Sequence, residues 1–135
     1  MNDYNDVRDN VWKILLNCAV DSLPVSVTKV AAGASVKIFK NSEFPMLHAH
    51  EAGMSLLYDD QWYIIFNGNM PKPRCRFTIA HELGHIILKH DYIFKNSNVK
   101  TFDISKPQIE TEADVFASRL LAPACVLWGL RLHTA

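Results

Sequence analysis

The sequence predicts an α+β fold in which a small β-sheet from the first half of the chain packs beside helices. Two apolar stretches rich in aromatic and β-branched residues, 54–57 and 61–66, are separated by residues 58–60, which is typical of a β-hairpin. Residues 74–90 and 108–123 instead repeat their apolar side chains at helical spacing. Together these patterns predict a compact domain with a sheet on one side and helices on the other.

The other predicted elements are shorter. Residues 4–20 carry apolar side chains at helical spacing after Asn and Asp residues suited to capping, which predicts an amphipathic helix. A second, short helix is expected after Pro24 and is broken near Gly33. A strand is expected to follow at residues 35–39, and a short tail helix at residues 124–132.

Composition limits the classes of function. A chain of 135 residues that is 49% hydrophobic suits one core, so we expect residues 1–135 to form a single domain. Fourteen basic and fourteen acidic residues cancel without a long block of like charge, which disfavours direct nucleic-acid binding. The polar, acidic start and the lack of about 18 consecutive apolar residues predict a cytoplasmic protein without membrane association. Cys18, Cys75 and Cys125 are widely spaced and are expected to be reduced, buried thiols.

The pentapeptide HELGH carries the first chemical signal. It places His81 and His85 four residues apart, so that on a helix both imidazoles can meet at one point. Glu82 lies beside the first histidine, and this is the arrangement of two zinc ligands with a neighbouring base. His48 and His50 form another close pair, but they have no acidic or sulfur partner at a recognised spacing, so we expect them in a loop.

A catalytic zinc usually has three protein ligands and one position open to water, so the two histidines need a partner. The stretch ETEAD opens the next predicted helix, after a polar segment, residues 91–107, that predicts a loop. Glu110 and Asp114 are four residues apart and can face the histidine helix together. Glu110 would complete the site, and Asp114 could accept a hydrogen bond from a ligand histidine. Glu112 is the alternative ligand, but it lies about 200° around the helix from Glu110 and should face away.

Several nearby residues have structural interpretations. His90 is expected to cap the carboxyl end of its helix, where positive charge suits the helix dipole. Gly84 lies inside a helix at a cost of about 1 kcal/mol, which predicts the close approach of a neighbouring element. Trp12, Trp62 and Trp128 are expected to belong to the core.

The stretch FTIAHELGHIIL, followed after about 25 residues by ETEADVFASRLLAP, resembles the ImmA/IrrE family of metallopeptidases, a gluzincin-like group. LPVSV, YIIFN and the approach R-x-RFTIAHE extend the likeness over most of residues 20–130. The resemblance implies a zincin-like fold with a small sheet beside the active-site helix. It also implies that His81, His85 and Glu110 bind Zn²⁺ and that Glu82 is the general base.

The resemblance further implies hydrolysis of a peptide bond. Zinc lowers the pKa of a bound water to about 7, and Glu82 takes the proton and passes it to the leaving amine. Tyr92, His90 or a backbone N–H could stabilise the oxyanion, and the sequence does not choose between them. Family members typically cut a repressor with a helix-turn-helix domain, so a repressor of a mobile element or stress regulon is the expected protein substrate. Two alternatives stay open: a zinc-binding partner module without turnover, and a zinc hydrolase of a small molecule or peptide.

Overall fold

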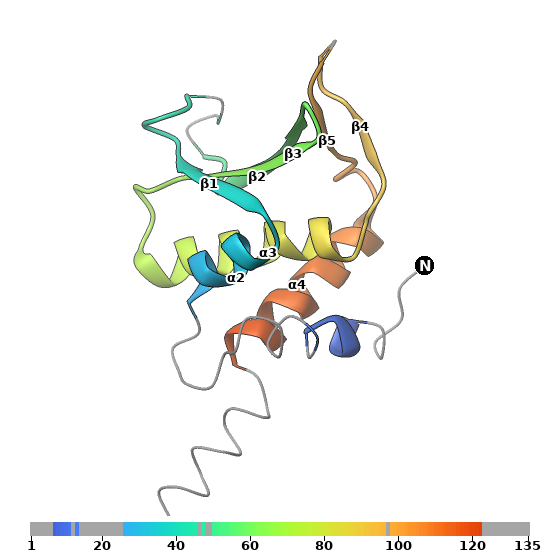
Figure 1. Ribbon diagram of the computed structural model, residues 1–135. Helices are drawn as coiled ribbons and strands as arrows, with labels where there is room; N and C mark the ends of the chain where they lie inside the picture. The colour runs from blue at the N-terminus through green and yellow to red at the C-terminus, as the bar shows by residue number, and fades with distance from the viewer. Residues whose placement is uncertain are drawn as a thin grey trace, which may run out of the picture.

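The fold is a five-stranded sheet with helices packed against one face (Figure 1). The computed structural model describes residues 7–11, 13, 26–45, 47, 50–96 and 98–122. Its helices are α2 (Val27–Gly33), α3 (Lys72–Ile87) and α4 (Pro107–Leu121), and its strands are β1 (Val36–Lys40), β2 (Gly53–Tyr58), β3 (Gln61–Phe66), β4 (Tyr92–Phe94) and β5 (Lys100–Phe102). This is the α+β architecture that the sequence predicts.

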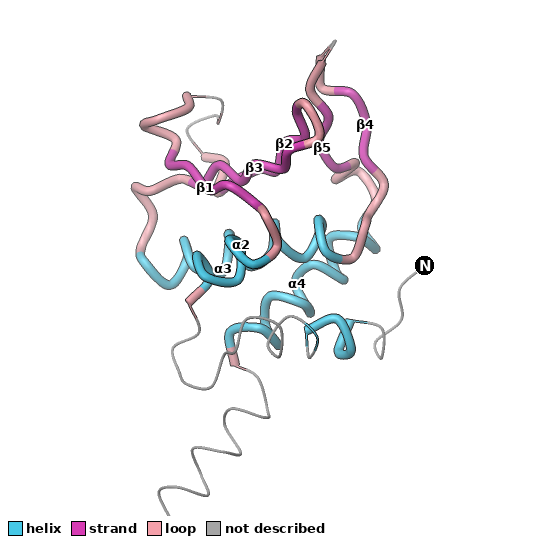
Figure 2. The backbone as a smooth tube through the Cα atoms, in the orientation of Figure 1, coloured by secondary structure: helices cyan, strands magenta, loops and turns pink. Residues whose placement is uncertain are grey.

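The sheet is mixed, with the strand order β1-β3-β2-β5-β4 (Figure 2). Strand β1 runs parallel to β3, whereas the other neighbours are antiparallel. The β2–β3 hairpin turns through Asp59 and Asp60, whose φ angles of 50° and 59° are left-handed. Two such residues in a row make the turn whose twist matches that of the flanking strands, and aspartate tolerates this conformation. The predicted hairpin is therefore confirmed.

The segment 91–107 corrects the sequence interpretation, because it contains two strands rather than a loop alone. Strand β5 extends the sheet by pairing with β2 at Leu57 and Lys100, and β4 then pairs with β5. The Trp62 ring stacks on Phe102 with centroids 4.8 Å apart and planes within 4°. Strands of three residues are too short to show an alternating pattern, and tertiary pairing of this kind stabilises them.

The helices lie close to their predicted positions. Ser26 caps α2 by accepting a hydrogen bond from the Lys29 backbone N–H, and the strand after α2 is shifted by one residue from its prediction. Helix α3 starts two residues earlier than predicted, since a proline in the first turn lacks only an N–H that the helix does not use. It ends three residues earlier than predicted, and Lys89 then turns the chain with a φ of 56°. Helix α4 likewise begins at a proline.

Residues 7–11 and Lys13 are helical, in agreement with the amino-terminal helix predicted from the sequence. Trp12 and the predicted tail helix with Trp128 lie outside the described residues, as do Cys18 and Cys125. Among the residues that the structure describes, no helix combines the length and apolar character needed to cross a membrane.

The core fills the space between the sheet and the helices, where Ile64, Leu83 and Phe116 are fully buried. Helices α3 and α4 approach each other closely at Gly84, where an added Cβ would lie 3.1 Å from Phe116 Cβ and 3.2 Å from Ala113 Cα. The close approach predicted for Gly84 is therefore confirmed. This contact positions the amino-terminal turn of α4 beside the histidines of α3.

Candidate metal centre

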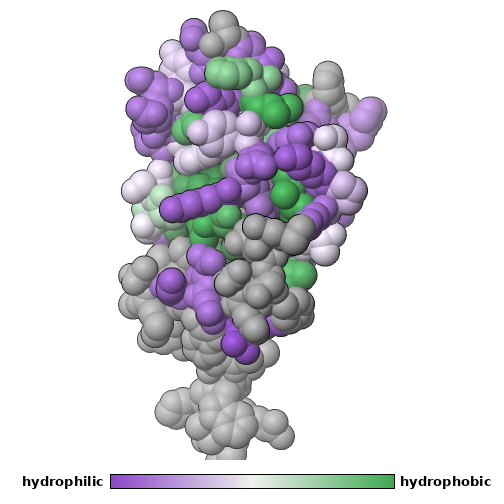
Figure 3. All heavy atoms as spheres, turned by 90° about the vertical axis from the view of Figure 1, so that its right-hand side faces the viewer, coloured by the Kyte–Doolittle hydropathy of each residue, from purple (hydrophilic) through white to green (hydrophobic). Residues whose placement is uncertain are grey.

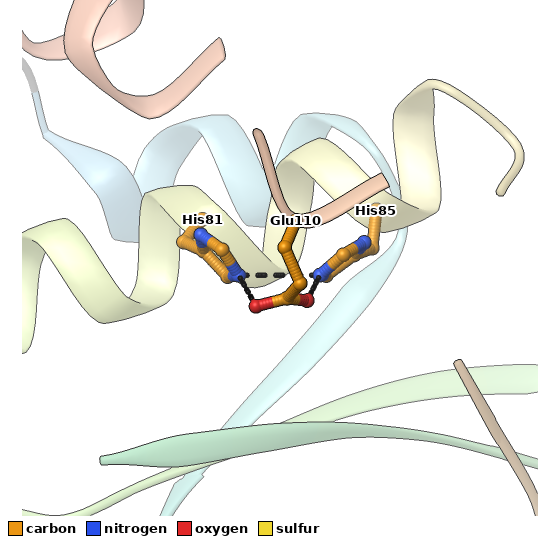
Figure 4. Close-up of side chains that lie close together, drawn as sticks. All are labelled: His81, His85 and Glu110. Atoms are coloured by element: carbon orange, nitrogen blue, oxygen red, sulfur yellow. Dashed lines mark hydrogen bonds and ion pairs between the residues drawn. The ribbon is translucent and has the colours of Figure 1, made fainter. Parts of the chain in front are cut away.

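His81 and His85 lie one turn apart on the face of α3 that points toward the sheet (Figure 4). Their Nε2 atoms are 3.2 Å apart. His85 is completely buried, and burial, together with the neighbouring His81 and His90, lowers its pKa to about 3. His85 is therefore a neutral imidazole at physiological pH, which is the form that binds metal.

Glu110 reaches the same point from the first turn of α4 (Figure 4). Its Oε2 lies 3.3 Å from His81 Nε2, and its Oε1 lies 2.8 Å from His85 Nε2. One ligand atom from each of the three side chains can be chosen so that all lie within 4.8 Å of one another. The structure thus brings together the three residues for which the sequence suggests a shared metal ion.

The chemistry of these three groups fits a divalent metal ion. Glu110 Oε1 is buried and receives no hydrogen bond, although it lies against His85. A buried acceptor without a donor is unfavourable unless a cation is present. Zinc bound tetrahedrally at about 2.0–2.1 Å sets its ligand atoms about 3.3–3.4 Å apart. The separation of the two histidine nitrogens is close to that value.

Glu82 lies beside this cluster rather than in it. Its Oε2 is 4.0 Å from His81 Nε2, and its Oε1 accepts a hydrogen bond of 2.7 Å from the hydroxyl of buried Ser55 on β2. Burial raises the pKa of Glu82, Glu110 raises it further, and Ser55 and His81 oppose the rise. A carboxylate with a raised pKa beside a metal site is suited to accept and return a proton. The sequence does not indicate a role for Ser55, because only the folding of the sheet brings this residue close to α3.

Asp114 holds the other ring nitrogen of His81. Its Oδ1 lies 2.8 Å from His81 Nδ1, and its side chain is otherwise exposed. A carboxylate in this position keeps the proton on Nδ1 and leaves Nε2 to the metal. The structure therefore places Asp114 where the sequence interpretation has it.

The prediction for His90 is wrong. His90 is buried, and its Nδ1 lies 2.9 Å from His85 Nδ1 while its Nε2 lies 2.7 Å from Glu112 Oε1. Its ring contacts these two side chains instead of capping the end of α3, because the backbone folds back after the helix and brings the ring inside. Glu112 does face away from Glu110 and the metal cluster, as its position on the helix predicts, but it faces a buried partner instead of solvent.

A cleft of about 510 Å³ opens beside Glu82 and Glu110. Neither Tyr92 nor His90 lines it, so neither is positioned to stabilise an oxyanion there. Its lining residues are Glu51, Ala52, Gly53, Arg74, Phe77, Thr78, His81, Glu82, Ile104, Glu110 and Asp114.

His50 is exposed in a turn and His48 lies outside the described residues, whereas Cys75 is a half-buried free thiol.

The mixed sheet, the histidine helix and the carboxylate from the next helix define the class of protein, a metallopeptidase domain. The family model of the IrrE N-terminal-like domain, Peptidase_M78, matches residues 36–128, more than half of the chain. The chain therefore belongs to the ImmA/IrrE family of zinc metallopeptidases. No curated protein matches the sequence.

Proposed function

We propose that this protein is a zinc-dependent endopeptidase in which His81, His85 and Glu110 bind the metal. The observation that carries the proposal is the convergence of two imidazole nitrogens and an unsatisfied carboxylate oxygen on one point, beside a buried carboxylate. Zinc held by these residues would polarise a peptide carbonyl and acidify the attacking water.

Glu82 is the general base in this proposal. Its buried carboxylate takes the proton of the attacking water as the oxygen bonds to the carbonyl carbon, and the proton then passes to the amine nitrogen as the C–N bond breaks. Ser55 holds the Glu82 carboxylate in place through its 2.7 Å hydrogen bond. The raised pKa of Glu82 favours the return of the proton to the leaving group.

The form of the cleft supports a polypeptide substrate rather than a small molecule. The cleft runs past Gly53, at the start of β2. In the described part of the chain, β2 pairs with β5 only at Leu57, so the first half of β2 has no strand partner on that side. An extended peptide can pair with such an edge.

Exposed apolar side chains in the cleft and on the edge strand β4 support the same conclusion. Ile104 lines the cleft and is 70% exposed, and Ile93 and Phe94 are exposed on the edge strand β4. The face of the molecule on the β4 side mixes apolar and polar groups (Figure 3). Exposed apolar side chains that lie together can contact another protein. We propose that the substrate is a transcriptional repressor with a helix-turn-helix domain, belonging to a mobile element or stress regulon.

The test is incubation of the zinc-loaded protein with the repressor encoded beside its gene, followed by intact-mass measurement. The Glu82→Gln variant is the matched control, since it keeps the metal ligands. One discrete cut that the variant does not make is the expected result. If zinc and repressor both bind but no cut occurs, the domain is a zinc-binding partner module without turnover.

A further inference from the structure

The turn after α3 folds His90 back under His85. The His90 backbone N–H donates to the His85 carbonyl at 3.1 Å, and the Lys89 N–H donates to the Ile86 carbonyl at 3.2 Å. Together with the left-handed φ of Lys89, these two bonds form a Schellman motif. Lysine adopts this conformation at a cost that glycine avoids. The turn therefore fixes the backbone from which the His90 ring reaches into the protein.

The turn brings His90 into a buried series of hydrogen-bonded side chains. His85 Nδ1 lies 2.9 Å from His90 Nδ1, and His90 Nε2 lies 2.7 Å from Glu112 Oε1. Glu112 Oε2 also accepts a hydrogen bond of 3.2 Å from Gln108 Nε2. Phe102 stacks on the His85 ring, with centroids 5.0 Å apart. His85, His90 and Glu112 are each at least nine-tenths buried.

The positions of the protons in this series depend on one another. A carboxylate oxygen accepts a hydrogen bond, so a His90 ring with one proton carries that proton on the Nε2 that faces Glu112. His90 Nδ1 is then an acceptor, and the short contact with His85 requires the proton of His85 to be on its Nδ1. His85 Nε2 is left with its lone pair, and that is the atom that faces Glu110 and His81.

We propose that Glu112 and His90 are positioning residues for the metal site. Glu112 acts through His90 to keep the proton of His85 on Nδ1 and to hold the ring so that Nε2 is available to the metal. This inference rests on the proposed function only in taking His85 as a metal ligand. His81 is oriented differently, by direct contact with the exposed carboxylate of Asp114. One ligand histidine is thus oriented from the surface, and the other through two buried side chains.

The direct test is the protonation site of each ring, measured by long-range ¹H–¹⁵N NMR on the metal-free wild-type protein at neutral pH. The expected result is a proton on Nδ1 of His85 and on Nε2 of His90. A proton on His85 Nε2, on His90 Nδ1, or on both nitrogens of either ring overturns the proposal. Peptide cleavage is not involved, so this result is independent of whether the protein is a peptidase.

A second test uses Glu112→Gln. In the variant, Gln108 still donates its amide N–H, so the oxygen of the new amide at position 112 turns toward Gln108. The NH₂ group of the new amide then turns toward His90. His90 must then accept on Nε2, and the proton of His85 moves to the nitrogen that faces the metal. Loss of a group that orients a metal ligand weakens metal binding about 10- to 100-fold, and we expect a zinc dissociation constant raised by that factor.

The matched control is Glu43→Gln, the same change at an exposed residue away from the site. Zinc affinity is measured by competition with a chelating dye, after circular dichroism shows that both variants are folded. An unchanged dissociation constant in folded Glu112→Gln overturns the positioning role. If that variant does not fold, the ring protonation sites in the wild-type protein decide the question.

Discussion

Gly84→Ala tests how strictly the contact between α3 and α4 sets the metal site. The added Cβ would lie 3.1 Å from two atoms of Phe116 and 3.2 Å from Ala113 Cα, whereas carbon atoms pack best at about 3.5–4.0 Å. Because one of the crowded atoms is backbone, α4 itself must shift. Overpacking of a core costs about 1–3 kcal/mol, and the higher helix propensity of alanine returns about 1 kcal/mol. We therefore expect a net loss of about 0–2 kcal/mol in the free energy of unfolding.

The shift also moves Glu110, which lies one turn before Ala113 on the same helix, away from the two histidines. Weaker zinc binding should accompany the loss of stability. Urea unfolding of the metal-free protein and zinc titration measure the two effects. Gly68→Ala is the control, since the nearest atoms to its Cβ would belong to the flexible side chain of Lys40, at 3.4 Å and beyond. If Gly84→Ala gains the full 1 kcal/mol of helix propensity and binds zinc as wild type does, the contact does not constrain the site.

Three further predictions concern the side chains around the metal. Glu82→Gln should bind zinc as wild type does but lose about 10²- to 10⁴-fold in cleavage rate. If the variant cleaves at the wild-type rate, Glu82 is not the general base. Ser55→Ala removes a hydrogen bond that lowers the pKa of Glu82, so this pKa should rise. The acid limb of the pH–rate profile should then move to higher pH. An acid limb at the wild-type pH would show that Ser55 does not act on Glu82. Asp114→Asn should raise the zinc dissociation constant about 10- to 100-fold, because Asp114 orients His81. The protein should stay folded, because Asp114 is exposed. Calorimetric titration measures the dissociation constant.

Much of the fold follows from local sequence patterns. The β2–β3 hairpin and helices α3 and α4 are long enough for their apolar spacing to be visible, and each lies within a few residues of its prediction. Strands β4 and β5 could not be predicted, because each has three residues and depends on pairing with distant segments. Helix α3 ends before its predicted end, because the left-handed turn is made by Lys89, whereas a glycine at that position would indicate the turn in the sequence.

The metal cluster was predictable because its spacing is a property of helices. His81 and His85 on one helix, and Glu110 with Asp114 on another, each share a face at four-residue separation. The supporting contacts were not predictable in the same way. Ser55 comes from the sheet, and the pairing of His90 with Glu112 joins the turn after α3 to α4 across 22 positions of sequence.

The central claim is that two imidazoles and one carboxylate bind a single zinc ion, and X-ray absorption spectroscopy of the zinc-loaded protein tests it most directly. We expect one zinc per chain with nitrogen and oxygen ligands at about 2.0–2.1 Å and the scattering pattern of two imidazole rings. The Glu110→Gln variant should lose affinity and change the oxygen contribution while keeping both rings. A sulfur ligand at about 2.3 Å, or the signature of a single imidazole, would contradict the site described here.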